Sequence, residues 1–180
     1  MQIPPIYVLR HGETEWNRDA RWQGRRNSPL TALGRDQAAQ QGRLLEGLCL
    51  PDFDIRVSPQ GRAFQTAAIA LAAQVDSLVT DERLCEIDVG AWTGRLRHAL
   101  QPSPGPIDED TPDGPLALYA HAPNGEGFAR LRLRCSAFLC DLQRPTICVT
   151  HGITSRMLRA IALDQPTAKI GDLPGGQGGI

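Results

Sequence analysis

The amino-acid sequence predicts an α/β fold, a three-layer α/β/α sandwich with a mostly parallel central sheet. Three observations predict this class. Apolar segments that are too short for typical helices alternate with longer amphipathic stretches. The segments between them are long enough to carry the crossover helices that parallel strands require. Two of the apolar segments end in a His-Gly pair, at 11–12 and at 151–152.

The first strand is expected at Ile3–Leu9, which is apolar and β-prone and ends at the charged pair and glycine of 10–12. Thr31 is a predicted N-cap for a helix that reaches about Gly47. The residues expected to form the inward stripe of that helix are Ala38, Leu44, Leu45 and Leu48. Asp54–Val57 is a second predicted strand.

A helix is expected to follow directly, with Ser58 as its cap and Pro59 in its first position. The residues expected on one face of this helix are Ala63, Phe64, Ala67, Ala68 and Leu71. Ser77–Thr80 is a further predicted strand. The stretch from about 95 to 125 is predicted to be a loop-rich insertion outside the core, because it holds six prolines and the acidic cluster 108–110.

The last third of the chain repeats the helix–strand–helix pattern. One helix is predicted from residues that step by three or four, and Pro145 is expected to stop it; these residues are Phe128, Leu131, Cys135, Phe138 and Leu142. Thr146–Thr150 reads as another buried strand that leads into a helix bearing Met157, Leu158 and Ile161. The 180 residues fit one domain, 1–180.

Composition excludes several classes of protein. The chain is 41% hydrophobic and 22% charged with a net charge of -1, so it is neither disordered nor basic enough to attract nucleic acid. No apolar run is long enough to span a membrane, and no secretory signal is recognisable, so we expect a cytoplasmic protein. Five cysteines without a Cys-x-x-Cys pair argue against disulfides and against a metal site.

Three predicted strand ends bring reactive groups to one rim of the sheet. His11 and His151 each follow a strand, and Arg62 follows a third. Ligands of parallel sheets bind beyond the carboxyl ends of the strands, and the start of a helix favours an anion there. With Arg10 beside His11, these residues form a predicted pocket for a phosphate dianion.

A histidine at a strand end is often only a helix cap or a satisfied core group, but its companions here favour phosphoryl transfer. The transferred group spreads charge over three oxygens, which two arginines and one histidine can bind without Mg²⁺. His11 is the candidate nucleophile, provided that a backbone carbonyl or similar acceptor holds its other ring nitrogen. His151 is then expected to stabilise the transition state.

The leaving oxygen needs a proton, and a carboxyl group with a raised pKa could supply it. Glu86 is the preferred candidate because its sequence neighbours are largely apolar. By residue type alone, Glu13, Glu15 and Asp88 are equally suitable.

Six segments of the sequence form a recognisable series of motifs. In order, they are 10–17 (RHGETEWN), 21–24 (RWQG), 29–31 (PLT), 58–67 (SPQGRAFQTA), Glu86 with 90–94 (GAWTG), and 149–152 (VTHG). This series resembles the histidine phosphatase superfamily, in the branch of cofactor-dependent phosphoglycerate mutases and their phosphatase relatives. The sequence departs from the family pattern at Asn27 and Thr93. The resemblance also implies a further strand after 175–180, so either this chain lacks that strand or the given sequence stops early.

The resemblance implies that His11 is the nucleophile, that Glu86 is the proton donor, and that Arg10, Arg62 and His151 bind phosphate. Further substrate-binding residues that it implies are Asn17, Gln23, Gly24 and Gly152. Asn17 and Gln23 could instead serve only to tie down a loop.

We therefore expect a phosphatase that hydrolyses small phosphate monoesters through a phosphohistidine on His11, with no metal and no cofactor. The alternatives are mutase-type phosphoryl transfer and, less favoured, a non-catalytic anion-binding domain. A mutase needs basic residues for a second anionic group, and the candidates are Arg21, Arg25, Arg26, Arg95 and Arg97. The expected partner is a small phosphorylated metabolite, with neither nucleic acid nor membrane, and a homodimer is left open.

Overall fold

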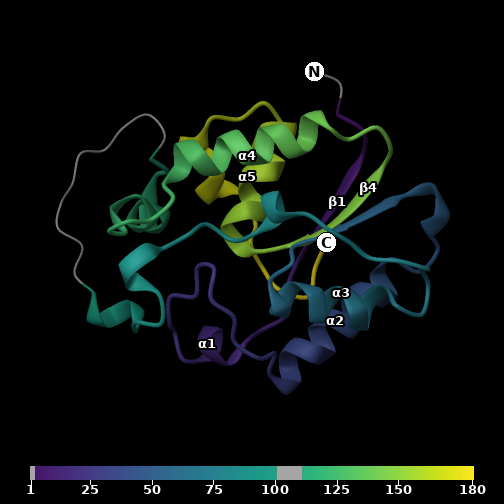
Figure 1. The fold of residues 1–180 in the computed structure, drawn as a ribbon, viewed down its shortest axis with the longest axis horizontal. Helices are drawn as coiled ribbons and strands as arrows, with labels where there is room; N and C mark the ends of the chain where they lie inside the picture. Colours follow the sequence, from purple (N-terminus) through teal and green to yellow (C-terminus); the bar gives the residue numbers. More distant parts are fainter. Residues whose placement is uncertain (1–2, 101–110) are drawn as a thin grey trace.

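The computed structural model describes residues 3–100 and 111–180. Its sheet has four parallel strands in the order β1-β4-β2-β3, with bounds Ile6–Arg10, Thr146–Thr150, Asp54–Val57 and Val79–Thr80. Helices α2 (Ala32–Leu44) and α3 (Gly61–Leu71) lie on one side of the sheet. Helices α4 (Phe128–Cys140) and α5 (Gly152–Ala162) lie on the other (Figure 1). The predicted three-layer α/β/α fold is confirmed.

The alternation of side chains along β4 explains how one strand serves both layers. Ile147 and Val149 pack in the cluster that includes Ala63 and Ala67 of α3. Cys148 points the other way, into the cluster formed by α4 and α5. All five residues of this strand are buried, which is the pattern of a parallel strand covered on both faces.

The strand register fixes where the strands end. Arg10 is paired with Thr150, and Val57 is paired with Val149. The amide of His11 then donates to the Thr150 carbonyl at 3.0 Å, and that of Ser58 donates to the Val149 carbonyl at 2.9 Å. The residues that follow β1, β2 and β4 consequently emerge at one edge of the sheet.

Some predicted boundaries and buried positions were wrong. The first strand begins at Ile6 instead of Ile3, and it extends through Arg10, whose register partner is Thr150. Helix α2 begins after Thr31 as predicted, and that side chain accepts a hydrogen bond from Gly34 N, but the helix ends at Leu44 instead of Gly47. Leu44 is 53% exposed, so its predicted inward position was wrong.

Helix α3 also differs from the prediction. Its N-cap is Gln60 instead of Ser58, because the Ser58 hydroxyl is engaged with His151 Nε2 at 2.8 Å and with Gln60 N at 3.3 Å. The helix therefore starts later, and its inward face is shifted. Phe64 is 42% exposed, while Arg62 is buried.

Helix α4 has the predicted face, with Phe128 and Leu131 among its buried residues, but it ends at Cys140, before Pro145 is reached, and Leu142 lies beyond its end. The predicted strand 77–80 is reduced to its last two residues, which form β3. No described helix is long and apolar enough to cross a membrane.

The predicted insertion is more ordered than expected where the structure describes it. Gly114–His121 forms successive 3₁₀ turns, and Tyr119 packs edge-on against Trp22 with ring centroids 4.8 Å apart. Ala122 is buried beside Trp22 and Trp92, so this part of the insertion contributes to a small core. The predicted acidic cluster 108–110 and the prolines at 102, 104 and 106 lie outside the described residues.

Candidate active site

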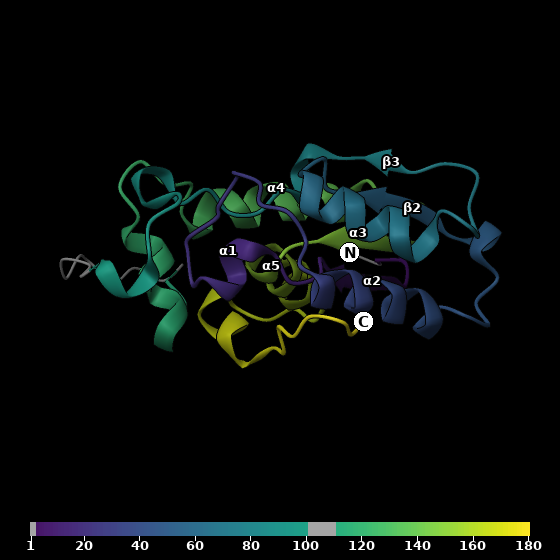
Figure 2. The same cartoon turned by 90° about the horizontal axis from the view of Figure 1, so that it is seen from below.

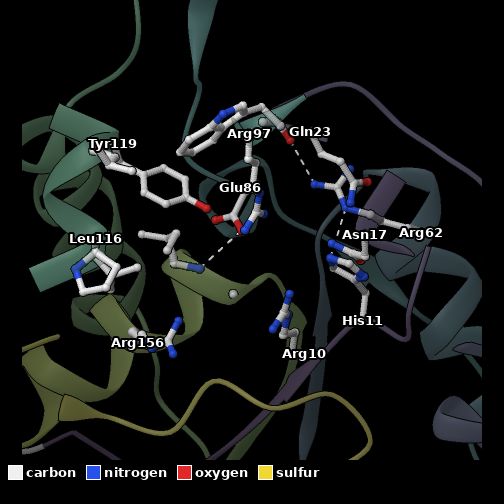
Figure 3. A pocket seen from close by; sticks show the side chains of 16 residues that line it. Arg10, His11, Asn17, Gln23, Arg62, Glu86, Arg97, Leu116, Tyr119 and Arg156 are labelled. Atoms are coloured by element: carbon white, nitrogen blue, oxygen red, sulfur yellow. Dashed lines mark hydrogen bonds between the residues drawn. The ribbon is translucent and has the colours of Figure 1, made fainter. Parts of the chain in front are cut away.

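A cavity of about 270 Å³ opens at the carboxyl ends of the strands (Figure 3). Its wall contains eight of the residues predicted for the site, which are Arg10, His11, Arg62, Glu86, Asn17, Gln23, Gly24 and Gly152. The remaining wall residues are Trp22, Arg97, Pro115, Leu116, Leu118, Tyr119, Ile153 and Arg156. The structure thus brings together residues from both halves of the chain.

His11 is held as a neutral imidazole with one ring nitrogen directed at Arg62. Its Nδ1 lies 2.7 Å from the Gly12 carbonyl oxygen, so this nitrogen must carry the proton. The lone pair of Nε2 accepts a hydrogen bond from Arg62 Nε at 3.2 Å. Burial lowers the pKa of His11 well below its ordinary value, and the charges of Arg62 and Arg10 lower it further.

Main-chain contacts fix the loop that carries His11. Gly12 N donates to the Thr66 hydroxyl at 3.1 Å, and that hydroxyl donates to the Arg62 carbonyl at 2.7 Å. Gly12 also packs on Gly34, where a Cβ on either glycine would lie 2.0 Å from a carbonyl oxygen of the other segment. The first turns of α2 and α3 therefore position the nucleophile candidate.

Arg62 comes from the first turn of α3 and is 1% exposed. Its Nη1 donates to the Arg26 carbonyl at 2.6 Å and its Nη2 to the Gly24 carbonyl at 2.9 Å. Burial lowers the pKa of Arg62 to about 10, which still leaves the guanidinium charged at neutral pH. Asn27 Oδ1 accepts from Arg62 N at 2.8 Å, so the residue that departs from the family pattern binds an amide in the first turn of α3.

Arg10 is wedged between α5 and the C-terminal segment. Its guanidinium lies so close to Gly152 that a Cβ there would be 3.3 Å from Arg10 Cζ and Nε. Its Nη1 donates to the Gly175 carbonyl. Its Nε is buried and has no described partner, so this N–H is available to an anion in the cavity.

His151 caps α5 and lies beside His11, with ring centroids 5.1 Å apart. It is fully buried and is absent from the described cavity wall. Its Nε2 is paired with the Ser58 hydroxyl at 2.8 Å, while its Nδ1 has no described partner. Burial, then the charge of Arg62, lowers the pKa of His151 well below its ordinary value, so the ring is neutral without a ligand.

Glu86 reaches the cavity from the loop between the 3₁₀ turns Glu82–Leu84 and Gly90–Trp92, and it faces the first turn of α5. Its Oε1 accepts from Ile87 N at 3.0 Å and from Thr154 N at 3.1 Å, and its Oε2 accepts from Ile153 N at 3.3 Å. The Thr154 hydroxyl donates to the Cys85 carbonyl at 2.7 Å and lies 3.1 Å from Glu86 Oε1. The carboxyl group is thus oriented by polar donors, although the sequence neighbours of Glu86 are largely apolar. The Tyr119 hydroxyl points toward it (Figure 3).

The competing carboxylates lie elsewhere. Glu13 Oε1 accepts from the Thr31 hydroxyl at 2.7 Å, and Asp88 Oδ1 accepts from Gly90 N at 2.8 Å. Glu15 lies in the first turn of α1 (Glu15–Arg18) and is exposed. Glu86 is the one carboxylate in the described cavity wall.

The predicted substrate-binding residues Asn17 and Gln23 line the cavity, and both also form hydrogen bonds within their own loop. Asn17 Oδ1 accepts from Thr14 N at 3.2 Å and from the Thr14 hydroxyl at 3.0 Å. Gln23 Nε2 donates to Thr14 Oγ1 at 2.8 Å, and its buried Oε1 has no described partner. Gly24 has φ +51°, and a Cβ on it would lie 2.7 Å from Val89.

Sequence reasoning missed several residues of the site. Gln60 joins two predicted parts, because its Nε2 donates to the Gly24 carbonyl at 3.0 Å and its Oε1 accepts from Glu86 N at 2.6 Å. It lies within the 58–67 motif, so the motif was the signal. Tyr119 and Arg156 had no such signal, because they reach the cavity only through the tertiary fold.

Most of the basic residues predicted to bind a second anionic group lie outside the described cavity wall. Arg97 lines the cavity, with its guanidinium 5.2 Å from the centre of the Trp22 ring. Arg21 donates instead to the Gly94 carbonyl at 2.9 Å, and Arg25 lies 3.8 Å from Glu126. Neither these two nor Arg26 and Arg95 belong to the described wall, whereas Arg156 of α5 does.

The fold and the cavity together define an α/β protein with a histidine–arginine anion pocket at the carboxyl edge of a parallel sheet. Sequence comparison gives the family. The chain belongs to the histidine phosphatase superfamily, branch 1, whose family model matches residues 6–180. The suspected resemblance is therefore confirmed.

Individual relatives carry both phosphatase and mutase names. The chain is 35% identical over 170 residues to "Probable phosphoglycerate mutase GpmB" of Klebsiella pneumoniae strain 342, covering 89% of this chain and 75% of that protein. It is similar to the solved α-ribazole phosphatase of Shigella flexneri, with a TM-score of 0.78, 27% identity and coverage of 96% and 86%. It is also similar to the solved phosphoglycerate mutase of Thermus thermophilus, with a TM-score of 0.67, 33% identity and coverage of 86% and 82%.

Proposed function

We propose that this chain is a metal-independent phosphatase that hydrolyses small phosphate monoesters through a phosphohistidine on His11. The observation that carries the proposal is the orientation of the His11 ring. Its Nδ1 is held by the Gly12 carbonyl at 2.7 Å, which leaves the Nε2 lone pair beside the Arg62 guanidinium. A neutral imidazole with a fixed tautomer, placed where a phosphate would be bound, has the requirements of a nucleophile.

The first half of the reaction transfers the phosphoryl group to the protein. His11 Nε2 attacks phosphorus in line as the bond to the ester oxygen breaks, and Glu86 delivers a proton to the departing oxygen. Arg10 Nε and the Arg62 guanidinium surround the equatorial oxygens, whose charge they offset. The dianion would also favour a protonated His151, because it opposes the arginine charges that, after burial, lower the pKa of this ring.

The second half returns the protein to its starting state. A water molecule gives a proton to Glu86 as its oxygen attacks the phosphohistidine, the P–N bond breaks, and inorganic phosphate leaves. The same carboxyl group therefore serves as acid and then as base. Its three hydrogen bonds from the main-chain N–H groups of 87, 153 and 154 support this role, because they keep it oriented through both steps.

His11→Ala is expected to abolish turnover of p-nitrophenyl phosphate, because the variant lacks the attacking nitrogen. Rapid acid-free quenching of the wild type with a radiolabelled phosphate ester should trap label on the protein, and the variant should trap none. His98→Ala, at an exposed histidine outside the described cavity wall, is the matched control and should behave as wild type. Ordinary turnover by His11→Ala would remove His11 from the mechanism.

The same assay tests metal independence. A chelator such as EDTA should leave the wild-type rate unchanged, because arginines supply the charge that a metal ion would otherwise provide. A loss of activity that Mg²⁺ or Zn²⁺ restores would contradict this part of the proposal.

Mutase-type transfer is the second candidate, and the outer wall of the cavity favours it. Arg97 and Arg156 lie in that wall in addition to Arg10 and Arg62, and none of the four forms an ion pair with a described carboxylate. Figure 3 shows Arg156 on the side of the cavity away from His11, where a second anionic group of a substrate could bind.

Product analysis separates the two candidates. Phosphoglycerates incubated with the protein, with and without 2,3-bisphosphoglycerate, yield inorganic phosphate from a phosphatase and an isomer from a mutase. A non-catalytic anion-binding domain would yield neither while still binding phosphate.

A further inference from the structure

The C-terminal segment Leu173–Ile180 follows the 3₁₀ turns Thr167–Asp172 and runs from beside α5 towards α2 (yellow in Figure 2). β1 is an edge strand of the sheet, so no further strand covers its outer side among the described residues. The segment is anchored at both ends. Arg156 Nε donates to the Leu173 carbonyl at 2.9 Å, and Gln41 Nε2 donates to the Gly179 carbonyl at 3.0 Å.

Between these anchors, the carboxamide of Gln177 reaches the back of the active site. Its Nε2 lies 3.3 Å from the His11 carbonyl oxygen and 3.2 Å from Asn17 Oδ1. A carboxamide nitrogen carries two hydrogens, so one group can donate to both acceptors. Gln177 thereby ties the loop of the nucleophile to the side chain of a cavity-lining residue that lies 160 positions earlier in the chain.

This contact adds a third donor to the two from Thr14 that fix which end of the Asn17 amide faces the cavity. The oxygen and nitrogen of an asparagine are told apart by their hydrogen-bond partners. Asn17 Oδ1 receives Gln177 Nε2 at 3.2 Å as well as Thr14 N at 3.2 Å and the Thr14 hydroxyl at 3.0 Å. With the oxygen committed to these donors, the Asn17 NH₂ group is left to donate to an anion.

The same segment holds Arg10 from the opposite side of Gly152. Arg10 Nη1 donates to the Gly175 carbonyl, while the buried Arg10 Nε has no described partner. A Cβ on Gly175 would lie 2.2 Å from Arg156 Nη2, so a side chain there would displace the Arg156 guanidinium. Two prospective phosphate donors, Arg10 and Asn17, are therefore oriented by one short segment.

We propose that Gln177 is a positioning residue of the phosphate site, which acts through Asn17 and the His11 main chain and, with the Gly175 carbonyl, sets the N–H groups that receive the phosphate. This inference rests on the proposed function in taking phosphate as the ligand. It adds that the affinity for phosphate depends on a segment that does not itself reach the described cavity wall. Donors that are oriented before binding avoid the cost of ordering when the ligand arrives.

The test uses the full chain with Gln177→Leu, which keeps the approximate size and removes the donor. The inhibition constant of inorganic phosphate and the KM for p-nitrophenyl phosphate should both rise by roughly five- to tenfold, the effect of losing one oriented hydrogen bond. kcat should change by less than about twofold, because ground state and transition state lose the same contact. The melting temperature should stay within about 2 °C of wild type, as for most surface substitutions.

Two further variants keep the result interpretable. Gln177→Glu lacks the donor and adds a negative charge near the phosphate, so its inhibition constant for phosphate should exceed that of Gln177→Leu, and the excess should shrink at high salt. Ile180→Ala lies in the same segment, is 45% exposed in the wild type and leaves every contact of Gln177 in place, so it should match wild type.

An unchanged inhibition constant in both Gln177 variants would overturn the inference while leaving the proposed phosphatase intact. A lowered melting temperature with unchanged phosphate affinity would assign Gln177 a structural role only, which also overturns it. If the wild-type protein neither hydrolyses phosphate esters nor binds phosphate by calorimetry, the proposed function itself fails, and the inference fails with it.

Discussion

At the scale of single residues, the site is defined by which atom each side chain presents. Glu86 and Asp88 are separated by one residue, yet Glu86 lines the cavity while Asp88 caps the turn at Gly90. The sequence could not separate these carboxylates, because both follow the same apolar stretch and both are acids. The Gln60 side chain positions Glu86, because its Oε1 accepts a hydrogen bond from Glu86 N at 2.6 Å. This contact joins residues that lie 26 positions apart.

Glu86→Gln is expected to discriminate between substrates by their leaving groups. Hydrolysis of an alkyl phosphate should fall by roughly 10²- to 10⁴-fold, because an alkoxide cannot leave without a proton. p-Nitrophenyl phosphate should lose much less in the first chemical step, since nitrophenolate leaves unprotonated. Steady-state rates on both substrates, with single-turnover release of nitrophenolate, give the comparison, and equal losses would contradict the acid role.

At the scale of elements, the site depends on three strand ends and on the helices that follow them. The bounds of β2 and β4 were predicted to the residue, because an alternating segment before Ser-Pro marks β2 and an apolar segment before His-Gly marks β4. The start of α3 was predicted wrongly, because serine is a preferred N-cap residue and Ser58 precedes the actual N-cap, Gln60. Only the contact of Ser58 with His151 assigns it to the site instead of the helix.

The close packing of α2 on the loop after β1 gives a prediction about stability. Gly34→Ala would improve the helix propensity of α2 by about 1 kcal/mol if the site were open. A Cβ at Gly34 would however lie 2.0 Å from the Glu13 carbonyl oxygen, so something in the main chain must shift. We expect a net loss of about 3 kcal/mol in the free energy of unfolding and a fall in kcat/KM, because the loop carries His11.

Urea denaturation and steady-state kinetics of Gly34→Ala measure both effects. Gly179→Ala, where a Cβ would meet nothing within 4 Å, is the matched control and should leave stability and activity close to wild type. A variant at Gly34 that is as stable as wild type would show that this loop yields more easily than its packing indicates.

At the scale of the whole molecule, burying two histidines among arginines ties stability to pH. Burial, followed by the arginine charges, lowers the pKa of both His11 and His151 in the folded state. Below the ordinary histidine pKa of about 6.5, the unfolded chain therefore binds more protons than the folded chain. The stability is complete above that pH and is lost as the pH falls below it.

The free energy of unfolding should fall by about 1.4 kcal/mol for each of these histidines between about pH 7.5 and pH 5.5. The double variant His11→Asn, His151→Asn should show a flatter dependence over this range, whatever its absolute stability. Urea denaturation at a series of pH values compares the two slopes. Equal slopes in wild type and variant would assign the acid sensitivity to other groups.

The sequence by itself determined the fold class, the family and which residue types lie at the strand ends, because local periodicity, turn residues and motifs are written in consecutive positions. The single-domain organisation stays a prediction, as do the expected compartment and the small phosphorylated partner. Only the tertiary structure decided that His11 Nδ1 faces Gly12, that Arg156 and Tyr119 complete the cavity, and that Gln177 lies behind His11. Such contacts join positions up to 166 residues apart, and packing alone brings those positions together.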